Sequence, residues 1–396
     1  WGPGGGGGAM WMYGSGTVAD NHMHENHSDY HAGGAYFYYG SVEFTGNTVA
    51  YNTNGEDGAG VYFSVSSSEI TNNVFEGNAA YDDGGGLRLY YGSCTIEDNE
   101  FIGNTAGDDG AGAKFSHSEH YLSGNYFEGN ATGDAGGGLE LDNDSTHTVG
   151  NTFIGNTATR GAGLHNWRTE ASFEIENNVF DRNVAWDCGG AMSFDNSPYW
   201  IHVHHNIMTF NEAVDGGAIC VDMVYREPDD VGGREDYYQD SYLNIFNTVI
   251  SENVASDDGG ALYVKAGQVK LSNSVIDDNY GASSGTIATK GSPVVVSNSI
   301  FYDNDGYATA LVEDDIEGES GSNSWEYSSF YDNDGDFTGV DGPSADDGNI
   351  FGDPLMNEDW ELESDSPCID AGDPNVEDPD GSRSDIGAFG GPDGSW

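Results

Sequence analysis

Apolar and polar positions repeat along this chain with a period of about 26 residues. One unit, residues 70–89, contains an apolar residue, a polar run, a Phe, an Asn three positions later, an acidic pair, and glycines that open an apolar alternation. The glycine position returns every 26 residues, at Gly34, Gly60, Gly86, Gly112 and Gly138. Alternation over short segments is typical of strands and differs from the i, i+3, i+4 pattern of a helix. A fixed period of this size predicts stacked supersecondary units.

Two columns of side chains keep step with the glycines. The first column is apolar and the second follows it by three positions: Phe75, Phe101, Phe127 and Phe153, then Asn78, Asn104, Asn130 and Asn156. Stacked Phe rings would fill the interior, while Asn tolerates left-handed turns and its amide can bond from coil to coil as a ladder. The sequence therefore predicts an all-β, single-domain parallel β-helix of about 11–12 coils.

The repeat also predicts where the β-helix ends. We expect it to span residues 1–335, with insertions near 22–31, 222–241 and 313–324. Residues 336–396 lose the period and consist of acidic turns, which predicts a C-terminal cap packed on the last coil through Trp360, Leu362 and Ile369. Because the chain starts at Trp1 and shows no signal peptide, we interpret it as a processed chain or a fragment.

Charge and cysteine content narrow the classes of partner and compartment. The chain has 68 acidic and 11 basic residues and a formal net charge of −57, which argues against binding to nucleic acid or anionic membranes. Its apolar runs are too short to span a membrane. An acidic, Lys-poor β-solenoid suits an extracellular or cell-surface protein. The four cysteines occupy different positions of the repeat: Cys94, Cys188, Cys220 and Cys368. This arrangement does not predict a disulfide scaffold, and the sequence leaves open whether any of them are paired.

Acidic residues recur just before the glycines and form a candidate metal site. They fall at nearly one position of the repeat: Asp82, Asp83, Asp108, Asp109, Asp134, Asp257 and Asp258. Stacked about 5 Å apart they would repel one another, and Ca²⁺ is the cation that prefers such oxygen ligands. A solvated acidic surface is the equal alternative. In the tail, Asp378, Asp380 and Asp385 have the alternating-oxygen spacing of a calcium loop without the full EF-hand pattern. A structural Ca²⁺ is therefore the expected cofactor.

Two further stretches carry candidate ligands. His22, His24, His27 and His31 could bind Zn²⁺ or Cu²⁺, but a loop of exposed histidines is the favoured interpretation. Tyr225, Tyr237 and Tyr238 lie in the 222–241 insertion and could form an aromatic platform for a glycan.

Two recurring motifs resemble a known family. They are FEGN at 75–78, FIGN at 101–104 and 153–156, GGAI at 216–219 and GGAL at 259–262. These motifs resemble the repeats of chlamydial polymorphic outer-membrane proteins and, more widely, of right-handed parallel β-helix surface and secreted proteins of bacteria. The tail is similar to C-terminal segments of secreted bacterial β-helix proteins. The resemblance implies a right-handed, exported β-helix and leaves the activity open, because this fold hosts many functions.

These observations favour a non-enzymatic extracellular structural or adhesive protein, stabilised by cations and able to associate head-to-tail into a filament. The alternative is a glycan-binding or glycan-cleaving secreted β-helix. Catalysis is the weaker expectation because the 11 basic residues look scattered and a chain of net charge −57 repels a polyuronate. The sequence also shows no nucleophile elbow or phosphate loop.

Overall fold

The computed structural model describes residues 7–169, 171–222, 241–265, 267–290, 292, 294–305, 309–311, 324–333 and 342–394. The chain forms an all-β, right-handed parallel β-solenoid of about 11 turns with a spacing of about 26 residues, as predicted. It divides into two compact units, residues 1–193 and 194–396. The division falls within the repeats, inside strand β28 (Met192–Asp195).

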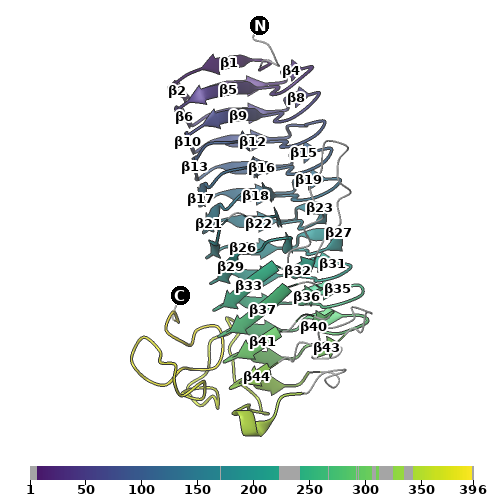
Figure 1. Ribbon diagram of the computed structural model, residues 1–396, viewed down its shortest axis with the longest axis vertical. Helices are drawn as coiled ribbons and strands as arrows, with labels where there is room; N and C mark the ends of the chain where they lie inside the picture. The colour runs from purple at the N-terminus through teal and green to yellow at the C-terminus, as the bar shows by residue number, and fades with distance from the viewer. Residues whose placement is uncertain are drawn as a thin grey trace. The chain divides into compact units, whose positions relative to one another are not determined.

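Each coil of unit 1 contributes one strand to each of three parallel sheets, and most coils add a further strand in a fourth row. Figure 1 shows β1, β5, β9, β12 and β16 of the first sheet stacked one below another. The first sheet consists of β1 (Met10–Tyr13), β5 (Ala35–Gly40), β9 (Val61–Ser66), β12 (Leu87–Tyr90), β16 (Ala113–Ser116), β20 (Leu139–Asp142) and β24 (Leu164–Trp167). The second consists of β2 (Gly16–Ala19), β6 (Val42–Thr45), β10 (Glu69–Thr71), β13 (Thr95–Glu97), β17 (Tyr121–Ser123), β21 (His147–Val149) and β25 (Phe173–Glu176).

The third and fourth sheets of unit 1 follow the same order. The third consists of β3 (His22–His24), β7 (Thr48–Ala50), β11 (Val74–Glu76), β14 (Glu100–Ile102), β18 (Tyr126–Glu128), β22 (Thr152–Ile154) and β26 (Val179–Asp181). The short strands are the pair β4 (His27–Ser28) and β8 (Thr53–Asn54), and the row β15 (Thr105–Ala106), β19 (Ala131–Thr132), β23 (Thr157–Arg160) and β27 (Val184–Cys188).

Unit 2 has the same four rows. Its first sheet contains β32 (Ile219–Asp222), β36 (Leu262–Val264), β40 (Ile287–Thr289) and β43 (Thr309–Leu311), and its second β29 (Trp200–His204), β33 (Ser241–Phe246), β37 (Gly267–Ser272), β41 (Val294–Ser297) and β44 (Ser324–Glu326). Its third contains β30 (Ile207–Thr209), β34 (Val249–Ser251), β38 (Val275–Asp277), β42 (Ile300–Tyr302) and β45 (Ser329–Tyr331), and its fourth β31 (Glu212–Ala213), β35 (Val254–Ala255) and β39 (Tyr280–Gly281). The 3₁₀ turn η1 (Ala345–Asp347) follows.

The Phe column forms the centre of unit 1. Strand pairing is in register, with Phe75 opposite Phe101 and Phe127 opposite Phe153. Successive rings from Phe75 to Phe153 stack with centroids 4.8, 4.5 and 4.7 Å apart and planes within 7° of parallel. The spacing of stacked strands therefore equals the spacing of the rings.

The Asn column forms a buried ladder beside these rings. The side-chain oxygen of Asn130 accepts hydrogen bonds from the backbone N–H and the side-chain Nδ2 of Asn104, both at 3.0 Å. Its own Nδ2 donates to the Phe101 carbonyl and to Asn156 Oδ1, both at 2.9 Å. Every polar atom of this buried amide is bonded, so each Asn joins neighbouring coils.

A second Asn ladder, not anticipated from the sequence, lies between the second and third sheets. Asn47, Asn73, Asn99, Asn125 and Asn151 are all buried, and each amide bonds to the next. A Cβ at Gly112 would lie 2.4 Å from the Gly138 carbonyl oxygen, which explains why the predicted glycine column stays free of side chains there. Both features let the coils approach closely.

The predicted insertion at 22–31 is wrong. Strand β3 pairs in register with β7, with Met23 opposite Val49, and β4 pairs with β8. Met23 is 5% exposed and takes the position of the Phe column, while Asn26 donates its N–H and Nδ2 to Asn52 Oδ1. The stretch is an ordinary coil whose outward-facing positions are histidines. The other two predicted insertions lie largely outside the described residues.

The sequence predicts a cap on the last coil, and the start of the tail lies there: Ile350 pairs with Ser329 of β45, and Asn349 Nδ2 donates to the Trp325 carbonyl at 2.9 Å. The rest of the tail packs along the side of unit 2. Val249, Val275 and Ile300, the first residues of β34, β38 and β42, are fully buried against Ile386 and Ala388. In Figure 1 the yellow C-terminal segment lies beside these coils. The first position of third-sheet strands is mixed in unit 1, where Val74, Glu100 and Thr152 occupy it, whereas β34, β38 and β42 of unit 2 all have an aliphatic residue there. This change creates the apolar strip that the tail covers.

Polar contacts fasten the tail at several coils. Asn247 Nδ2 donates to the carbonyls of Ala388 and Gly390 at 2.7 and 2.8 Å. Asn298 Oδ1 accepts from the Asp373 N–H at 2.7 Å. Trp360 and Leu362 are partly buried in the contact, as expected, but Ile369 is exposed.

Candidate functional site

The predicted acidic residues of unit 1 form two rows with different environments. In the inner row, Asp83 Oδ1 accepts the Asp109 N–H at 3.3 Å and Asp109 Oδ1 accepts the Ala135 N–H at 3.1 Å. In the outer row, Asp108 and Asp134 are exposed and Asp82 is half-buried. Burial and then the neighbouring carboxylates raise the pKa values of Asp82 and Asp108. The inner row is thus part of the coil-to-coil hydrogen bonding, while the outer row faces solvent.

A lysine of the chain, Lys114, occupies the place expected for a metal ion in this row. Lys114 Nζ lies 2.8 Å from Asp83 Oδ2 and 2.8 Å from Asp109 Oδ2, and its side chain is 7% exposed. Burial alone would lower the pKa of Lys114, but the charges of Asp109 and Asp83 raise it above its ordinary value. Arg88 adds a second cation 4.0 Å from Asp83. The ammonium ion is therefore held in its charged form between the two carboxylates.

Other basic residues also lie at these acidic turns. Arg160 Nη1 lies 2.9 Å from Asp187 Oδ2, and in unit 2 Lys290 Nζ lies 3.5 Å from Asp258 Oδ2. The basic residues are therefore less scattered than expected, because these four lie beside carboxylates of the acidic turns, and Arg88 lies opposite Lys114 in the first sheet.

Three carboxylates of unit 2 form a tighter group. Ligand atoms of Asp215, Asp257 and Asp258 all lie within 4.8 Å of one another. Burial raises the pKa of Asp215 to about 6, and the charges of Asp258 and Asp257 add to the increase. A cation placed between them would relieve this repulsion. Their oxygen ligands suit Ca²⁺, with Asp257 and Asp258 as predicted and Asp215 as the additional residue.

The structure does not bring the predicted ligands of the tail loop together. Asp378 accepts the N–H groups of Asp385 and Gly391 at 3.0 and 2.5 Å. Asp380 binds Ser382, and Asp385 accepts the Asp370 N–H at 2.7 Å. Within the part of the chain described, the groups of three metal-ligating side chains do not include these aspartates. Each carboxylate closes a different turn. Tyr225, Tyr237 and Tyr238 lie outside the described residues.

The first-sheet position of Lys114 is occupied in the next two coils by buried ionisable residues, Glu140 and then His165. His165 Nδ1 lies 2.6 Å from Glu140 Oε2, and both side chains are 1% exposed. Burial raises the pKa of Glu140 to about 7. Nearby, His120 and Asp144 form a second fully buried pair, 3.6 Å apart; burial lowers the pKa of His120 to about 3 and raises that of Asp144 to about 8. None of these groups is accessible to a substrate.

Unit 1 has an exposed surface region that is rich in aromatic side chains. We define the aromatic face as the outward and turn residues at the end of first-sheet strands: Trp11, Tyr13, Tyr38, Tyr39, Tyr90, Tyr91 and His117. Tyr13, Tyr39 and Tyr91 are 67%, 45% and 46% exposed. The alternation of β5 explains them, because Ala35 and Phe37 point inward and Tyr36 and Tyr38 outward. The sequence signal was present as YFYY at 36–39 and LYY at 89–91.

The aromatic face contains two clusters of rings. Tyr38 and Tyr39 have centroids 4.5 Å apart, and Tyr13 lies 6.0 Å from each. Two coils further on, Tyr90 and Tyr91 are 4.6 Å apart. His117 stacks on Tyr91 with centroids 5.0 Å apart. Buried Tyr36 and Tyr62 lie beneath the first cluster and support it, so the exposed rings rest on a packed base.

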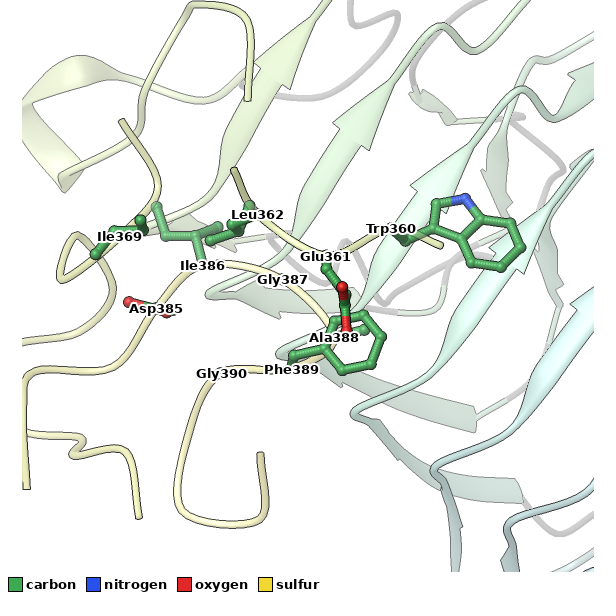
Figure 2. A pocket seen from close by; sticks show the side chains of 10 residues that line it. All are labelled: Trp360, Glu361, Leu362, Ile369, Asp385, Ile386, Gly387, Ala388, Phe389 and Gly390. Atoms are coloured by element: carbon green, nitrogen blue, oxygen red, sulfur yellow. The ribbon is translucent and has the colours of Figure 1, made fainter. Parts of the chain in front are cut away.

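Unit 2 contains a pocket of about 450 Å³ between the tail segments. Figure 2 shows Leu362, Ile369 and Ile386 together on one side of it, and the Trp360 ring pointing away from them. The Trp360 indole donates from Nε1 to Asp277 Oδ2 at 2.8 Å instead. The walls of this pocket therefore do not form an aromatic platform.

Cys188 and Cys220 are each disulfide-bonded, whereas Cys94 and Cys368 are free and buried. Burial raises the pKa of the Cys94 thiol to about 12, so this thiol is unreactive at neutral pH.

The helices that the structure describes include none with the length and apolarity needed to cross a membrane.

Comparisons with known proteins bear on the fold. No curated protein matches the chain. The crystal structure of pectate lyase Pel9A is similar over 90% of this chain and 88% of that chain, with a TM-score of 0.35 and 16% identity. The family model described as right-handed β-helix region matches residues 3–118 and 59–223, two overlapping stretches that together cover more than half of the chain. The chain therefore belongs to the right-handed β-helix family.

Proposed function

We propose that this chain is an extracellular carbohydrate-binding β-helix whose ligand-binding surface is the aromatic face. The observation that carries the proposal is the pair of exposed ring clusters on the first coils. Soluble proteins rarely expose contiguous rings without a partner for them. The disulfide-bonded Cys188 and Cys220 support an oxidising compartment outside the cytoplasm.

The chemistry of the aromatic face suits sugar rings. The C–H groups on one side of a pyranose pack against a flat aromatic ring, and Tyr hydroxyls hydrogen-bond to sugar hydroxyls. Tyr91 and His117 present stacked rings in one cluster, and Tyr39, near the end of β5, is exposed in the other. The two clusters are two coils apart, or about 10 Å. That separation is comparable to two sugar units of an extended polysaccharide, so one chain could contact both clusters.

The net charge of −57 favours a neutral glycan over an acidic one as the ligand. A polyuronate would be repelled by the acidic chain, including the acidic rows at the other end of the first-sheet strands, whereas a neutral glycan would not. The basic groups under this surface, Arg88 and Lys114, are buried and bound to carboxylates. This supports binding of an uncharged glycan rather than proton abstraction from an acidic one.

Replacing Tyr39 and Tyr91 together by alanine is expected to weaken glycan binding about 10- to 100-fold, because each ring contributes on the order of 1 kcal/mol. A glycan array on the wild-type chain identifies the ligand, and isothermal titration measures its affinity for each variant. Tyr81→Ala with Tyr121→Ala is the matched control, since these tyrosines are 73% and 44% exposed on other faces. Equal affinity in both double variants would refute the proposed surface.

Calcium binding by Asp215, Asp257 and Asp258 is a second proposal, supported by their ligand atoms lying within 4.8 Å of one another. Saturation at about 100 times the dissociation constant is expected to add about 2.7 kcal/mol to the free energy of unfolding. Asp215→Asn with Asp257→Asn is expected to remove this gain. Denaturant unfolding with Ca²⁺ and with EDTA measures it, and identical midpoints for the wild-type chain would exclude the site.

The structural or adhesive role and the head-to-tail filament remain predictions. Self-association through the aromatic face is the outcome that competes with glycan binding. Sedimentation of the wild-type chain at high concentration separates the two, because a dimer that Tyr39→Ala dissociates would assign the rings to a protein contact.

A further inference from the structure

The first coil of unit 1 presents two histidines on one face of a strand. In β3, Met23 points into the core and is 5% exposed, so His22 and His24 both point outward from the third sheet. Side chains two positions apart on a strand share a face. Their ring centroids lie 5.4 Å apart. Because this stretch is a strand and not a loop, the two imidazoles are held side by side by the backbone.

We propose that His22 and His24 form a surface site for a divalent transition-metal ion of the Zn²⁺, Cu²⁺ or Ni²⁺ class. Two imidazoles bound to one ion through nitrogens at about 2.0–2.1 Å, at a near-tetrahedral angle, have centroids roughly 5 Å apart. The observed 5.4 Å allows such a chelate with small changes of side-chain rotamer. Imidazole nitrogen favours these ions over Ca²⁺ and Mg²⁺, which prefer oxygen.

The surroundings of the pair support this assignment. Glu25 Oε2 lies 3.7 Å from His24 Nδ1, where a carboxylate can orient the ring and leave Nε2 for the metal ion. The Tyr51 ring lies edge-on to His24 with centroids 5.6 Å apart and limits its rotation. The paired strand β7 places Thr48 and Ala50, which carry no charge, beside the two histidines. The acidic chain also concentrates cations near its surface.

The other two histidines of the stretch are engaged elsewhere. His27 Nδ1 lies 2.9 Å from Thr53 Oγ1 and its Nε2 3.5 Å from Asp29. His31 lies between Glu56 and Asp57, at 3.2 and 3.6 Å. The metal site therefore consists of two protein imidazoles, and water completes the coordination of the ion.

Isothermal titration of the intact chain with ZnCl₂, in excess Ca²⁺ to occupy carboxylates, tests the site. We expect an isotherm at pH 7.5 that weakens at pH 5, because the metal ion binds only neutral imidazole. His24→Ala is expected to weaken this binding at least tenfold, and His27→Ala to leave it unchanged. The side chains of His24 and His27 are both exposed, so the unfolding midpoint of each variant should equal that of the wild-type chain.

Retention of the untagged chain on immobilised Ni²⁺ is a second measurement of the same pair. The wild-type chain and His27→Ala should be retained and eluted by imidazole, while His22→Ala with His24→Ala should pass through earlier. Equal retention of all three, or a Zn²⁺ isotherm that His24→Ala does not change, would overturn the assignment.

Discussion

Replacing Asn130 by alanine is expected to lower the free energy of unfolding by about 3–5 kcal/mol, because several buried polar groups lose their partners at about 1–3 kcal/mol each and the site relaxes only in part. The groups affected are the backbone N–H and side-chain amide of Asn104, the Phe101 carbonyl, and Asn156 Oδ1. Asn130 is fully buried, so water cannot replace its amide. Urea unfolding followed by circular dichroism measures the change.

Asn26→Ala is the matched control for the ladder. Asn26 lies in the first coil, is half-buried, and donates only to Asn52 Oδ1 in the ladder. Asn26→Ala should lower the urea midpoint of unfolding much less than Asn130→Ala does. Similar midpoints for the two variants would show that the amide ladder does not stabilise the coils as its hydrogen bonds indicate.

Replacing Lys114 by methionine is expected to lower the free energy of unfolding by about 3–5 kcal/mol, because the carboxylates of Asp83 and Asp109 would be left without their buried cation. Both carboxylates lie 2.8 Å from Nζ, and Asp109 is 5% exposed. Methionine retains most of the side-chain volume, so the change isolates the charge. Thermal unfolding gives the difference in Tm between the variant and the wild-type chain.

The double variant Asp109→Asn, Lys114→Met separates charge from packing. Removing one carboxylate together with the ammonium relieves part of the unbalanced charge, so the double variant should be more stable than the sum of the single changes predicts. Arg182→Met serves as the exposed control, because Arg182 pairs with Asp181 at a side-chain exposure of 64% and should matter little. If the changes in unfolding free energy of the two single variants simply add up in the double variant, a direct Lys114–Asp109 interaction is contradicted.

The repeat made the fold predictable because one period sets both the strand pairing and the side-chain columns. Once glycines and Phe residues recur every 26 residues, Phe75 must lie opposite Phe101, and the register follows. The second Asn ladder is equally regular in the sequence. It is hard to recognise there because Asn is common in this chain and Asn47 and Asn73 sit among other polar residues. The supposed insertion at 22–31 arose because Met23 stands where later coils have Val or Phe.

The candidate functional surfaces were less predictable because they depend on which groups meet across coils. The spacing of the aspartates predicted a row of like charges, but not that Lys114 of β16 would reach both Asp109 of its own coil and Asp83 of the preceding coil. The tail position depends on Val249, Val275 and Ile300, which look like ordinary strand residues until the tail covers them. The aromatic face was visible as outward positions of β5 and β12, yet its two clusters require the three-dimensional stacking of coils.

Affinity electrophoresis of the wild-type chain tests the central claim most directly. The chain is run through gels that contain a neutral glucan, mannan or xylan, and in parallel through gels that contain polygalacturonate. We predict retarded migration with at least one neutral glycan, loss of that retardation in Tyr39→Ala with Tyr91→Ala, and free migration with polygalacturonate. Unchanged mobility in every neutral gel, or retardation by polygalacturonate alone, would contradict carbohydrate binding by the aromatic face.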